Sequence, residues 1–325
     1  MKIQYGQIGV GHAHASKLEV YRKSDDYDVI GIVENDPQLR RQAEQDARYQ
    51  GVPWMTEQQL LNQPGLQVVG VETSVPQLLD TAERCIAAEK HVHLDKPAGE
   101  SLPQFKRILD QAASKHLAVQ MGYMYRYNPA VLMLQDWLRR GWLGEPFELH
   151  TVMSKLTEGA GRKTIANYSG GTMFELGCHL IDLVVGVLGP PDKVHSFARH
   201  SSSIADGCLD NMLAVFEYPT ATATIRSSID EPDGFARRHF TLCGTGGTFH
   251  IQPLDDPSAK IALREARPGH PARTHDHAFP KFQRYVADAA DLAKMVRNEK
   301  DSDYSYEHDY QVQRAILLAS GLAVD

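Results

Sequence analysis

Residues 3–14 of the chain read IQYGQIGVGHAH, and this stretch decides how the first part of the protein folds. Ile3 to Val10 reads as a strand, and the chain passes through Gly9 and Gly11 into a helical pattern that starts at His12. Gly9 permits a tight turn, and Gly11 lets the backbone approach a pyrophosphate. The third glycine of this fingerprint is absent, because His14 stands in its place. The stretch therefore predicts a dinucleotide-binding strand–turn–helix unit.

An acidic residue at the end of the second predicted strand supports this interpretation. Asp28 to Glu34 reads as a strand, and Glu34 ends it. A carboxylate there accepts hydrogen bonds from the adenosine ribose and repels a 2′-phosphate, so we expect NAD rather than NADP. Asp36 could share this role. The alternative is that Glu34 is only a solvent-exposed carboxylate at a strand end.

The first ~120 residues alternate β-rich and helical stretches, which predicts a parallel α/β sheet. Further strands are expected at 67–72, 91–94 and 117–121, and helices at 12–23, from 37 onward, 76–89 and 101–116.

After Gly122 the pattern changes. A helix is expected over 129–140, followed by strands at 147–156, 193–200, 212–218, 221–229, 238–243 and 261–265, and by closing helices near 281–298 and 307–322. Strands that follow one another without helices predict a mainly antiparallel sheet. We therefore expect an N-terminal Rossmann domain of α/β type over residues 1–122. An α+β domain with a large, mainly antiparallel open sheet is expected over residues 123–325.

The composition excludes several classes of protein. The chain has 325 residues, of which 42% are hydrophobic and 23% charged, and its net charge is −7 without any block of Lys and Arg. We expect no nucleic-acid partner and no membrane partner. No apolar run approaches the ~20 residues of a membrane span, and the first residues lack the apolar core of a signal peptide. The four cysteines form no metal or redox motif and suit thiols in a cytoplasmic protein.

Three polar residues stand out on an apolar stretch between residues 170 and 188. Glu175, His179 and Asp182 are spaced i, i+4 and i+7, so a helix would place them on one stripe. Such groups are costly to bury unless they are paired, and a His with carboxylates is typical of an acid–base site. The alternatives are a buried hydrogen-bonded network that only positions the helix, or a metal site.

A lysine follows the predicted strand at 91–94, within Asp95-Lys96-Pro97. Ligands of open α/β sheets bind beyond the carboxyl ends of the strands, so Lys96 is expected on the same edge as Gly9 and Gly11. Because Lys96 would bring a competing cation to the site, we expect no metal there. His275-Asp276-His277 also resembles a metal motif, but it stands in a Pro/Gly/His-rich stretch that we interpret as a surface loop.

Taken together, these motifs resemble those of the Gfo/Idh/MocA oxidoreductases, a family named for glucose–fructose oxidoreductase and inositol dehydrogenase. The resemblance rests on Gly9-x-Gly11, on Asp95-Lys96-Pro97, and on Gly170-Gly171-Thr172 before Glu175-x-x-x-His179-x-x-Asp182. It covers essentially the whole chain, including the order of the two domains.

The resemblance implies roles for individual residues. Lys96 matches the family's active-site lysine, His179 the catalytic histidine, and Glu175 the catalytic carboxylate four residues earlier. The expected cofactor contacts are Gly9, Gly11, His12, His14, Glu34, Thr73 and Lys96. The expected substrate contacts are Tyr123, Arg126, Tyr168, Glu175 and Asp182.

The sequence departs from the family pattern at four places. His14 replaces a glycine, Asp95 replaces the usual Glu, and Glu175 replaces the usual Asp. Leu78 stands where many members carry His. None of these departures removes Lys96 or His179.

The implied reaction is hydride transfer between nicotinamide and a hydroxyl carbon of a sugar, cyclic polyol or sugar acid. His179 would take the hydroxyl proton, oriented by Glu175 or Asp182, and Lys96 would stabilise the developing alkoxide. Two alternatives remain open: a non-catalytic, dinucleotide-sensing regulatory protein, and an NAD-assisted glycoside hydrolase or lyase. A half-covered sheet is an association surface, so we also expect a homodimer or homotetramer formed through the second domain.

Overall fold

The structure, a computed structural model, describes residues 1–324 and divides into two units. The first unit comprises Met1–Met124 and Gln283–Tyr310, and the second comprises Tyr125–Phe282 and the chain from Gln311 onward. The expected domains were each one continuous segment, whereas here a C-terminal segment returns to the first unit. Within residues 1–324, no helix is both long enough and apolar enough to cross a membrane.

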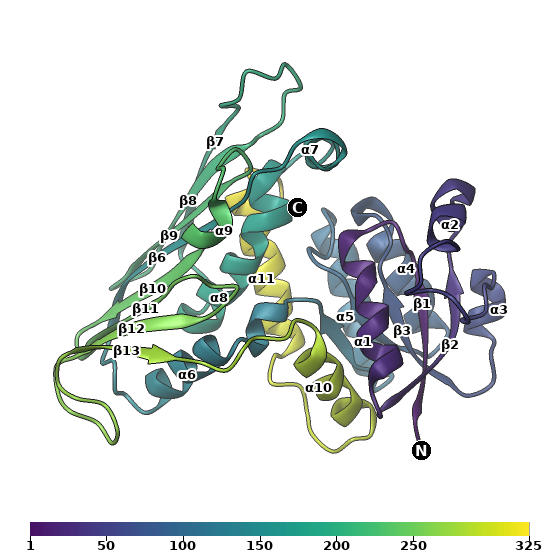
Figure 1. Ribbon diagram of the computed structural model, residues 1–325, viewed down its shortest axis with the longest axis horizontal. Helices are drawn as coiled ribbons and strands as arrows, with labels where there is room; N and C mark the ends of the chain where they lie inside the picture. The colour runs from purple at the N-terminus through teal and green to yellow at the C-terminus, as the bar shows by residue number, and fades with distance from the viewer. Residues whose placement is uncertain (325) are drawn as a thin grey trace. The chain divides into compact units, whose positions relative to one another are not determined.

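The first unit is built on a five-stranded sheet in the order β2-β1-β3-β4-β5, with every neighbouring pair parallel (Figure 1). Its strands are β1 (Ile3–Ile8), β2 (Tyr27–Val33), β3 (Leu66–Val71), β4 (His91–Leu94) and β5 (Val119–Met121). Its helices are η1 (Ala13–Lys17), α1 (Leu18–Lys23), α2 (Pro37–Ala43), α3 (Glu57–Leu61), α4 (Val75–Ala87), α5 (Leu102–Ser114) and the returning α10 (Val286–Val296). The strand order reverses between β1 and β3, and open α/β sheets bind ligands at the carboxyl ends beside such a reversal. The predicted parallel α/β fold is confirmed.

Aromatic packing explains why α10 belongs to the first unit. The rings of Tyr5 and Tyr21 stack with their centroids 4.0 Å apart, and Tyr27 packs edge-on against both. The Tyr27 hydroxyl donates to the carbonyl of Ala289 at 2.7 Å, and Leu292 is fully buried in the same core. This contact joins residues that are far apart in the sequence, so the local pattern did not predict it.

The second unit is built on an eight-stranded sheet in the order β13-β12-β11-β10-β6-β9-β8-β7. Among the described residues, β6 and β9 pair in parallel and the other neighbours pair antiparallel. The strands are β6 (Pro146–Ser154), β7 (Lys193–Arg199), β8 (Asn211–Glu217), β9 (Thr222–Ser228), β10 (His239–Gly244), β11 (Gly247–Ile251), β12 (Ser258–Leu263) and β13 (Thr274–Ala278). The mainly antiparallel sheet is as predicted.

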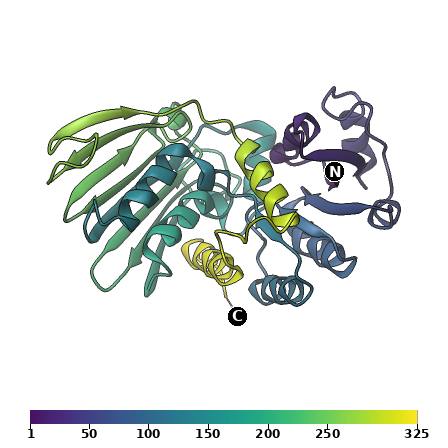
Figure 2. The same cartoon turned by 90° about the horizontal axis from the view of Figure 1, so that it is seen from below.

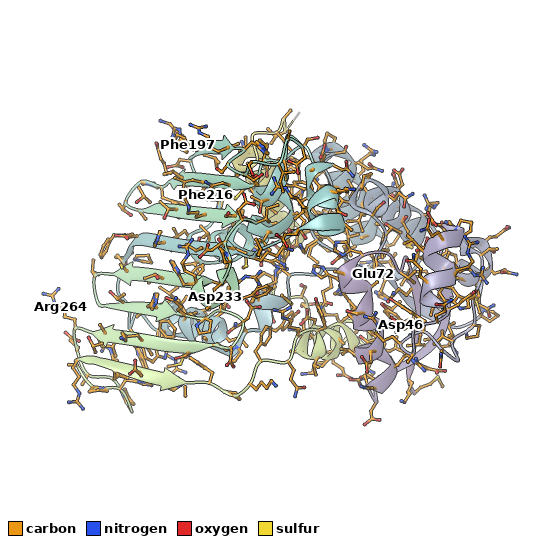
Figure 3. All side chains as sticks on the ribbon, turned by 45° about the horizontal axis from the view of Figure 1, so that its top comes forward. Asp46, Glu72, Phe197, Phe216, Asp233 and Arg264 are labelled. Carbon is orange, nitrogen blue, oxygen red and sulfur yellow. The ribbon has the colours of Figure 1, made fainter. Side chains whose placement is uncertain are left out.

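Helices cover one face of this sheet. Figures 1 and 2 show α6 (Pro129–Arg139), α8 (Cys178–Leu188) and α11 (Tyr306–Ala319) along that face. The remaining helical segments are η2 (Met124–Tyr127), α7 (Gly159–Ala166), η3 (Met173–Gly177) and α9 (Gly234–Arg237). On β8, Phe216 is fully buried, whereas Phe197 on neighbouring β7 is 47% exposed (Figure 3). The other face therefore leaves apolar side chains accessible.

One local expectation was wrong. His275-Asp276-His277 lies in strand β13 rather than in a loop, because it pairs with β12 through Ile261 and Lys260. β13 is an edge strand, where a polar composition is tolerated. The Pro- and Gly-rich residues around it therefore did not exclude a strand.

Candidate functional site

The glycine turn lies at the carboxyl end of β1 and leaves no room for a side chain at Gly9. Gly9 has a φ of +99°, and a Cβ placed on it would lie 2.4 Å from the carbonyl carbon of Glu72. A Cβ on Gly11 would lie 2.6 Å from a methyl carbon of Leu39. Gly9 therefore requires glycine for both conformation and space, whereas a small side chain at Gly11 would displace only the flexible end of Leu39.

The predicted acidic residue reaches the same turn. Glu34 Oε2 accepts the backbone N–H of Val10 at 3.0 Å, and its Oε1 accepts the N–H of Asp36 at 2.9 Å. Asp36 instead caps α2 by accepting the N–H groups of Gln38 and Leu39. Of the two acidic candidates, Glu34 is the one attached to the glycine turn.

Thr73 completes this edge of the sheet. Its backbone nitrogen would lie 2.5 Å from a Cβ on Gly9, so it packs directly against the turn. Within the described part of the chain, the buried Thr73 Oγ1 has no hydrogen-bond partner. A tight glycine cradle, an unsatisfied hydroxyl and a nearby carboxylate fit a bound dinucleotide.

Asp95, directly after β4, gathers three basic side chains. His14 Nδ1 donates to Asp95 Oδ1 at 2.9 Å, and His12 Nδ1 lies 2.7 Å from Asp95 Oδ2. Lys17 Nζ also donates to Asp95 Oδ1, at 3.4 Å. His14, which replaces the third glycine of the fingerprint, is thus joined to Asp95, the residue that precedes Lys96.

This arrangement gives the two histidines different protonation behaviour. Burial alone would lower the pKa of His12, but the Asp95 carboxylate more than offsets this and raises it. Burial dominates at His14 and lowers its pKa to about 4. The pKa of Asp95 is held well below its usual range despite burial, because His14 and Lys17 stabilise the anion. Asp95 therefore faces one imidazole whose pKa is lowered and one whose pKa is raised.

A buried network continues beneath the turn, and sequence reasoning missed it. Lys17 Nζ contacts Glu72 Oε1 at 2.8 Å and His93 Nε2 at 3.0 Å. His93 Nδ1 donates to Gln120 Oε1 at 2.9 Å, and Gln120 Nε2 donates to the carbonyl of Asp288 at 3.0 Å. Lys17 is 1% exposed. A lysine on a short amphipathic helix is normally solvated, so nothing local signalled its burial.

The ligand atoms of His12, His14 and Asp95 lie within 4.8 Å of one another, a spacing that a metal ion could use. However, the Lys17 ammonium lies 3.4 Å from the same carboxylate and would compete with a metal. Hydrogen bonds and charge pairing account for the cluster, and we assign no metal to it.

In the second unit, the polar stripe is not one continuous α-helix, contrary to expectation. Glu175 lies in the π-helical turn η3, and His179 and Asp182 lie on α8. The turn is attached to β9, because the Ser227 hydroxyl donates to the carbonyl of Thr172 at 3.0 Å. π-turns inside helices are frequent at functional sites, and single-sequence periodicity does not reveal them.

Asp182 and Arg126, both expected to contact substrate, contact each other. Arg126 Nη2 donates to Asp182 Oδ1 at 2.6 Å, and Arg126 Nε contacts both oxygens at 3.0 and 3.1 Å. The two side chains are 3% and 1% exposed. The pair ties η2 to α8, and the engagement of both Asp182 oxygens argues against the metal alternative for the stripe. A substrate role for either residue stays a prediction.

His179 is buried beside an aromatic ring that a charged network holds in place. The rings of Tyr125 and His179 meet edge to face with centroids 5.2 Å apart, and His179 is 4% exposed. The Tyr125 hydroxyl donates to Asp255 Oδ1 at 2.6 Å, and Arg238 Nη1 donates to Asp255 Oδ2 at 3.0 Å. Sequence reasoning did not predict roles for Arg238 and Asp255. The Tyr125 ring thereby restrains the orientation of the His179 imidazole.

The remaining predicted residues are placed as follows. Lys96 is buried directly after Asp95, at the carboxyl edge of the first sheet, and Tyr123 is buried just after β5. Tyr168 is half-buried, with its ring centroid 6.2 Å from that of Phe174, the neighbour of Glu175.

The two units match known domains. Residues 3–123 match the oxidoreductase family with an NAD-binding Rossmann fold, and residues 131–250 match the GFO/IDH/MocA C-terminal domain. The chain belongs to the Gfo/Idh/MocA family of oxidoreductases. The resemblance read from the motifs is thereby confirmed.

Individual relatives of this Gfo/Idh/MocA chain are distant. Trans-1,2-dihydrobenzene-1,2-diol dehydrogenase of Sus scrofa is 24% identical over 225 residues, which are 67% of this chain and 65% of the pig enzyme, less than two thirds of its length. D-xylose 1-dehydrogenase (NADP(+)) 2 of Haloferax volcanii is 25% identical over 231 residues, 70% of this chain and 68% of that enzyme. An oxidoreductase from Agrobacterium radiobacter, solved with NAD+, L-tartaric acid and magnesium, shares the fold with a TM-score of 0.84 at 15% identity, covering 98% of this chain and 96% of that one.

Proposed function

We propose that this protein is a dehydrogenase that transfers a hydride between NAD and a hydroxyl-bearing carbon of a sugar, cyclic polyol or sugar acid. The observation that carries the coenzyme part is the glycine turn at Gly9 and Gly11, with Glu34 bound to it and the Thr73 hydroxyl beside it. Relatives that act on a diol and on xylose, and the family membership, support the reaction class.

The preference for NAD over NADP rests on Glu34. Its carboxylate is already oriented by the N–H groups of Val10 and Asp36. An anion at this place accepts bonds from the two ribose hydroxyls of NAD and repels the 2′-phosphate of NADP. Gly9, Gly11, His12, His14, Thr73 and Lys96 complete the proposed coenzyme contacts.

The proposed chemistry divides the work between three side chains. When bound, nicotinamide accepts or donates the hydride. The His179 imidazole takes the hydroxyl proton during oxidation, and the Lys96 ammonium stabilises the negative charge that develops on the same oxygen. Glu175 is the proposed orienting carboxylate, because Arg126 already engages both oxygens of Asp182. Tyr123 and Tyr168 are proposed substrate contacts.

A coenzyme-by-substrate matrix tests this proposal. The protein is assayed with NAD and with NADP against a panel of aldoses, cyclic polyols and sugar acids, and NAD(P)H absorbance is followed. We expect reduction that depends on substrate and is faster with NAD. Bound coenzyme without any substrate-dependent turnover would favour the non-catalytic alternative.

We also propose that copies of the chain associate as a dimer or tetramer through the face of the eight-stranded sheet that carries Phe197. This aromatic side chain is 47% exposed on β7, where it pairs across the strands with Leu213 of β8. Light scattering of the wild type and of Phe197→Lys tests this, with a smaller assembly expected for the variant. We place the protein in the cytoplasm, in keeping with its sparse cysteines.

A further inference from the structure

Four charged side chains meet at the carboxyl edge of the first sheet, below the glycine turn. The carboxyl groups are Glu72 and Asp95, each at most 1% exposed, and the ammonium groups are Lys17 and Lys96, each 1% exposed. When both carboxyl groups are ionised, the two positive and two negative charges cancel and the edge carries no net charge. One imidazole can therefore decide whether the edge is neutral or positive.

His12 is that imidazole. It directly follows Gly11, and its Nδ1 lies 2.7 Å from Asp95 Oδ2 and accepts the backbone N–H of His14 at 3.4 Å. The side chain is 13% exposed, unlike the carboxylate that holds it, which is 1% exposed. An imidazole attached to a buried carboxylate through one nitrogen has its other nitrogen available to a ligand.

The dinucleotide that this turn is proposed to bind carries a pyrophosphate with two negative charges. A neutral edge supplies no net attraction for this dianion, whereas an imidazolium at His12 does. We propose that His12 is a protonatable contact for the pyrophosphate, so that binding of the dinucleotide takes up a proton at this residue. The proposal rests on the proposed NAD(P) binding and deepens it, because it makes coenzyme affinity depend on pH.

The pKa values of the groups next to His12 decide which other residues can gain or lose a proton between about pH 6 and pH 9. His14 shares the Asp95 carboxylate, but burial lowers its pKa to about 4, so it stays neutral. Glu72 titrates within the pH range of the test, because burial raises its pKa to about 7, partly offset by Lys17. The titratable and charged groups around His12 are His14, Lys17, Glu72, His93, Asp95 and Lys96; Tyr285 packs against Lys17, and Arg284 lies beside Tyr285. Glu72 therefore needs its own variant in any test.

Isothermal titration calorimetry with NAD+ tests the proposal without any substrate. Titrations in buffers of different ionisation enthalpy, with EDTA present to exclude metals, count the protons taken up on binding. For the wild type we expect uptake of a fraction of one proton, and affinity about tenfold weaker at about pH 9 than at about pH 6, which corresponds to a one-unit rise in the pKa of His12 on binding.

Variants assign the proton to one residue. In His12→Gln the uptake and the pH dependence are lost and affinity resembles that of the wild type at high pH. In His12→Lys the fixed charge keeps affinity high at every pH, again without uptake. Glu72→Gln retains the uptake. The matched control is His195→Gln, which removes another imidazole 2.7 Å from a carboxylate, that of Glu217 on the second sheet, and leaves binding unchanged.

The outcomes separate this proposal from the proposed function. Wild-type binding of NAD+ without proton uptake overturns the role of His12 and leaves the proposed function standing. Uptake that survives in His12→Gln, or that disappears only in Glu72→Gln, overturns it as well. Failure of the wild type to bind NAD+ or NADP+ overturns the proposed function and this inference together. A wild-type titration without proton uptake overturns the proposal even if no variant folds.

Discussion

The backbone N–H of Val10 donates a 3.0 Å hydrogen bond to Oε2 of Glu34, which joins the glycine turn after β1 to the end of β2. The carboxylate that is proposed to select the coenzyme is thereby fixed against the turn that is proposed to hold the pyrophosphate.

Replacing this carboxylate should change coenzyme selectivity. In Glu34→Ala the bonds to the ribose and the repulsion of a 2′-phosphate are both lost, so the ratio of NADP to NAD affinity should rise at least about tenfold. Fluorescence titration with NADH and NADPH measures the ratio. Asp36→Ala is the matched control: it removes the cap of α2, at a cost of about 1 kcal/mol of stability, without changing selectivity. An unchanged ratio in Glu34→Ala would refute the assignment.

Gly9→Ala should abolish dinucleotide binding. A Cβ at this position would lie 2.4 Å from the Glu72 backbone, so β3 or the turn must move. Gly51→Ala is the control, because Gly51 has a similar φ of +79° but no atom within 4 Å of the Cβ position. The control should cost only about 1 kcal/mol in chemical denaturation and should bind NADH normally. Normal binding by Gly9→Ala would show that the turn does not hold the coenzyme.

The buried Arg126–Asp182 pair should be a major source of stability in the second unit. Arg126→Met leaves an unpaired buried carboxylate and should lower the free energy of unfolding by about 3–5 kcal/mol. Lys106→Met, which breaks the exposed pair with Asp110, should cost less than about 1 kcal/mol. Urea denaturation measures both values. Equal losses in the two variants would mean that the buried pair contributes no more than a surface one.

His93 should make the protein less stable in acid. Burial, with the Lys17 ammonium adding to it, lowers the pKa of His93 from 6.5 to about 3. Between these values the unfolded chain binds more protons than the folded one, so stability falls as the pH falls below about 6.5. Relative to His93→Gln, which keeps an acceptor for Lys17, the wild type should lose about 2 kcal/mol between pH 6.5 and pH 5. Urea denaturation at both pH values measures the free energy of unfolding of the two proteins. An equal change in the wild type and in His93→Gln would contradict this prediction.

The parts of the fold that could be predicted from the sequence are those that local chemistry dictates. Gly9 and Gly11 marked the turn, and the alternation of strands and helices marked the parallel sheet. The confirmed family followed from motifs at three separate places along the chain.

Features created by long-range packing could not be predicted in this way. Burial of Lys17 depends on Glu72, His93 and Asp95, which lie on β4 or directly after β3 and β4, far from Lys17 in the sequence. The return of α10 to the first unit depends on its contact with Tyr27. The π-turn at Glu175 leaves no trace in hydrophobic periodicity. The roles of Lys96, His179 and Glu175 stay predictions.

The proposal that this chain is a dehydrogenase is tested most directly by coenzyme reduction in three proteins. Wild type, Lys96→Ala and His179→Ala are assayed for NADH formation on the best substrate of the panel, and NAD+ affinity is measured in parallel. The account predicts that each variant loses a factor of about 10²–10⁴ in turnover, while NAD+ affinity changes little for His179→Ala. Turnover at the wild-type rate in either variant would contradict it.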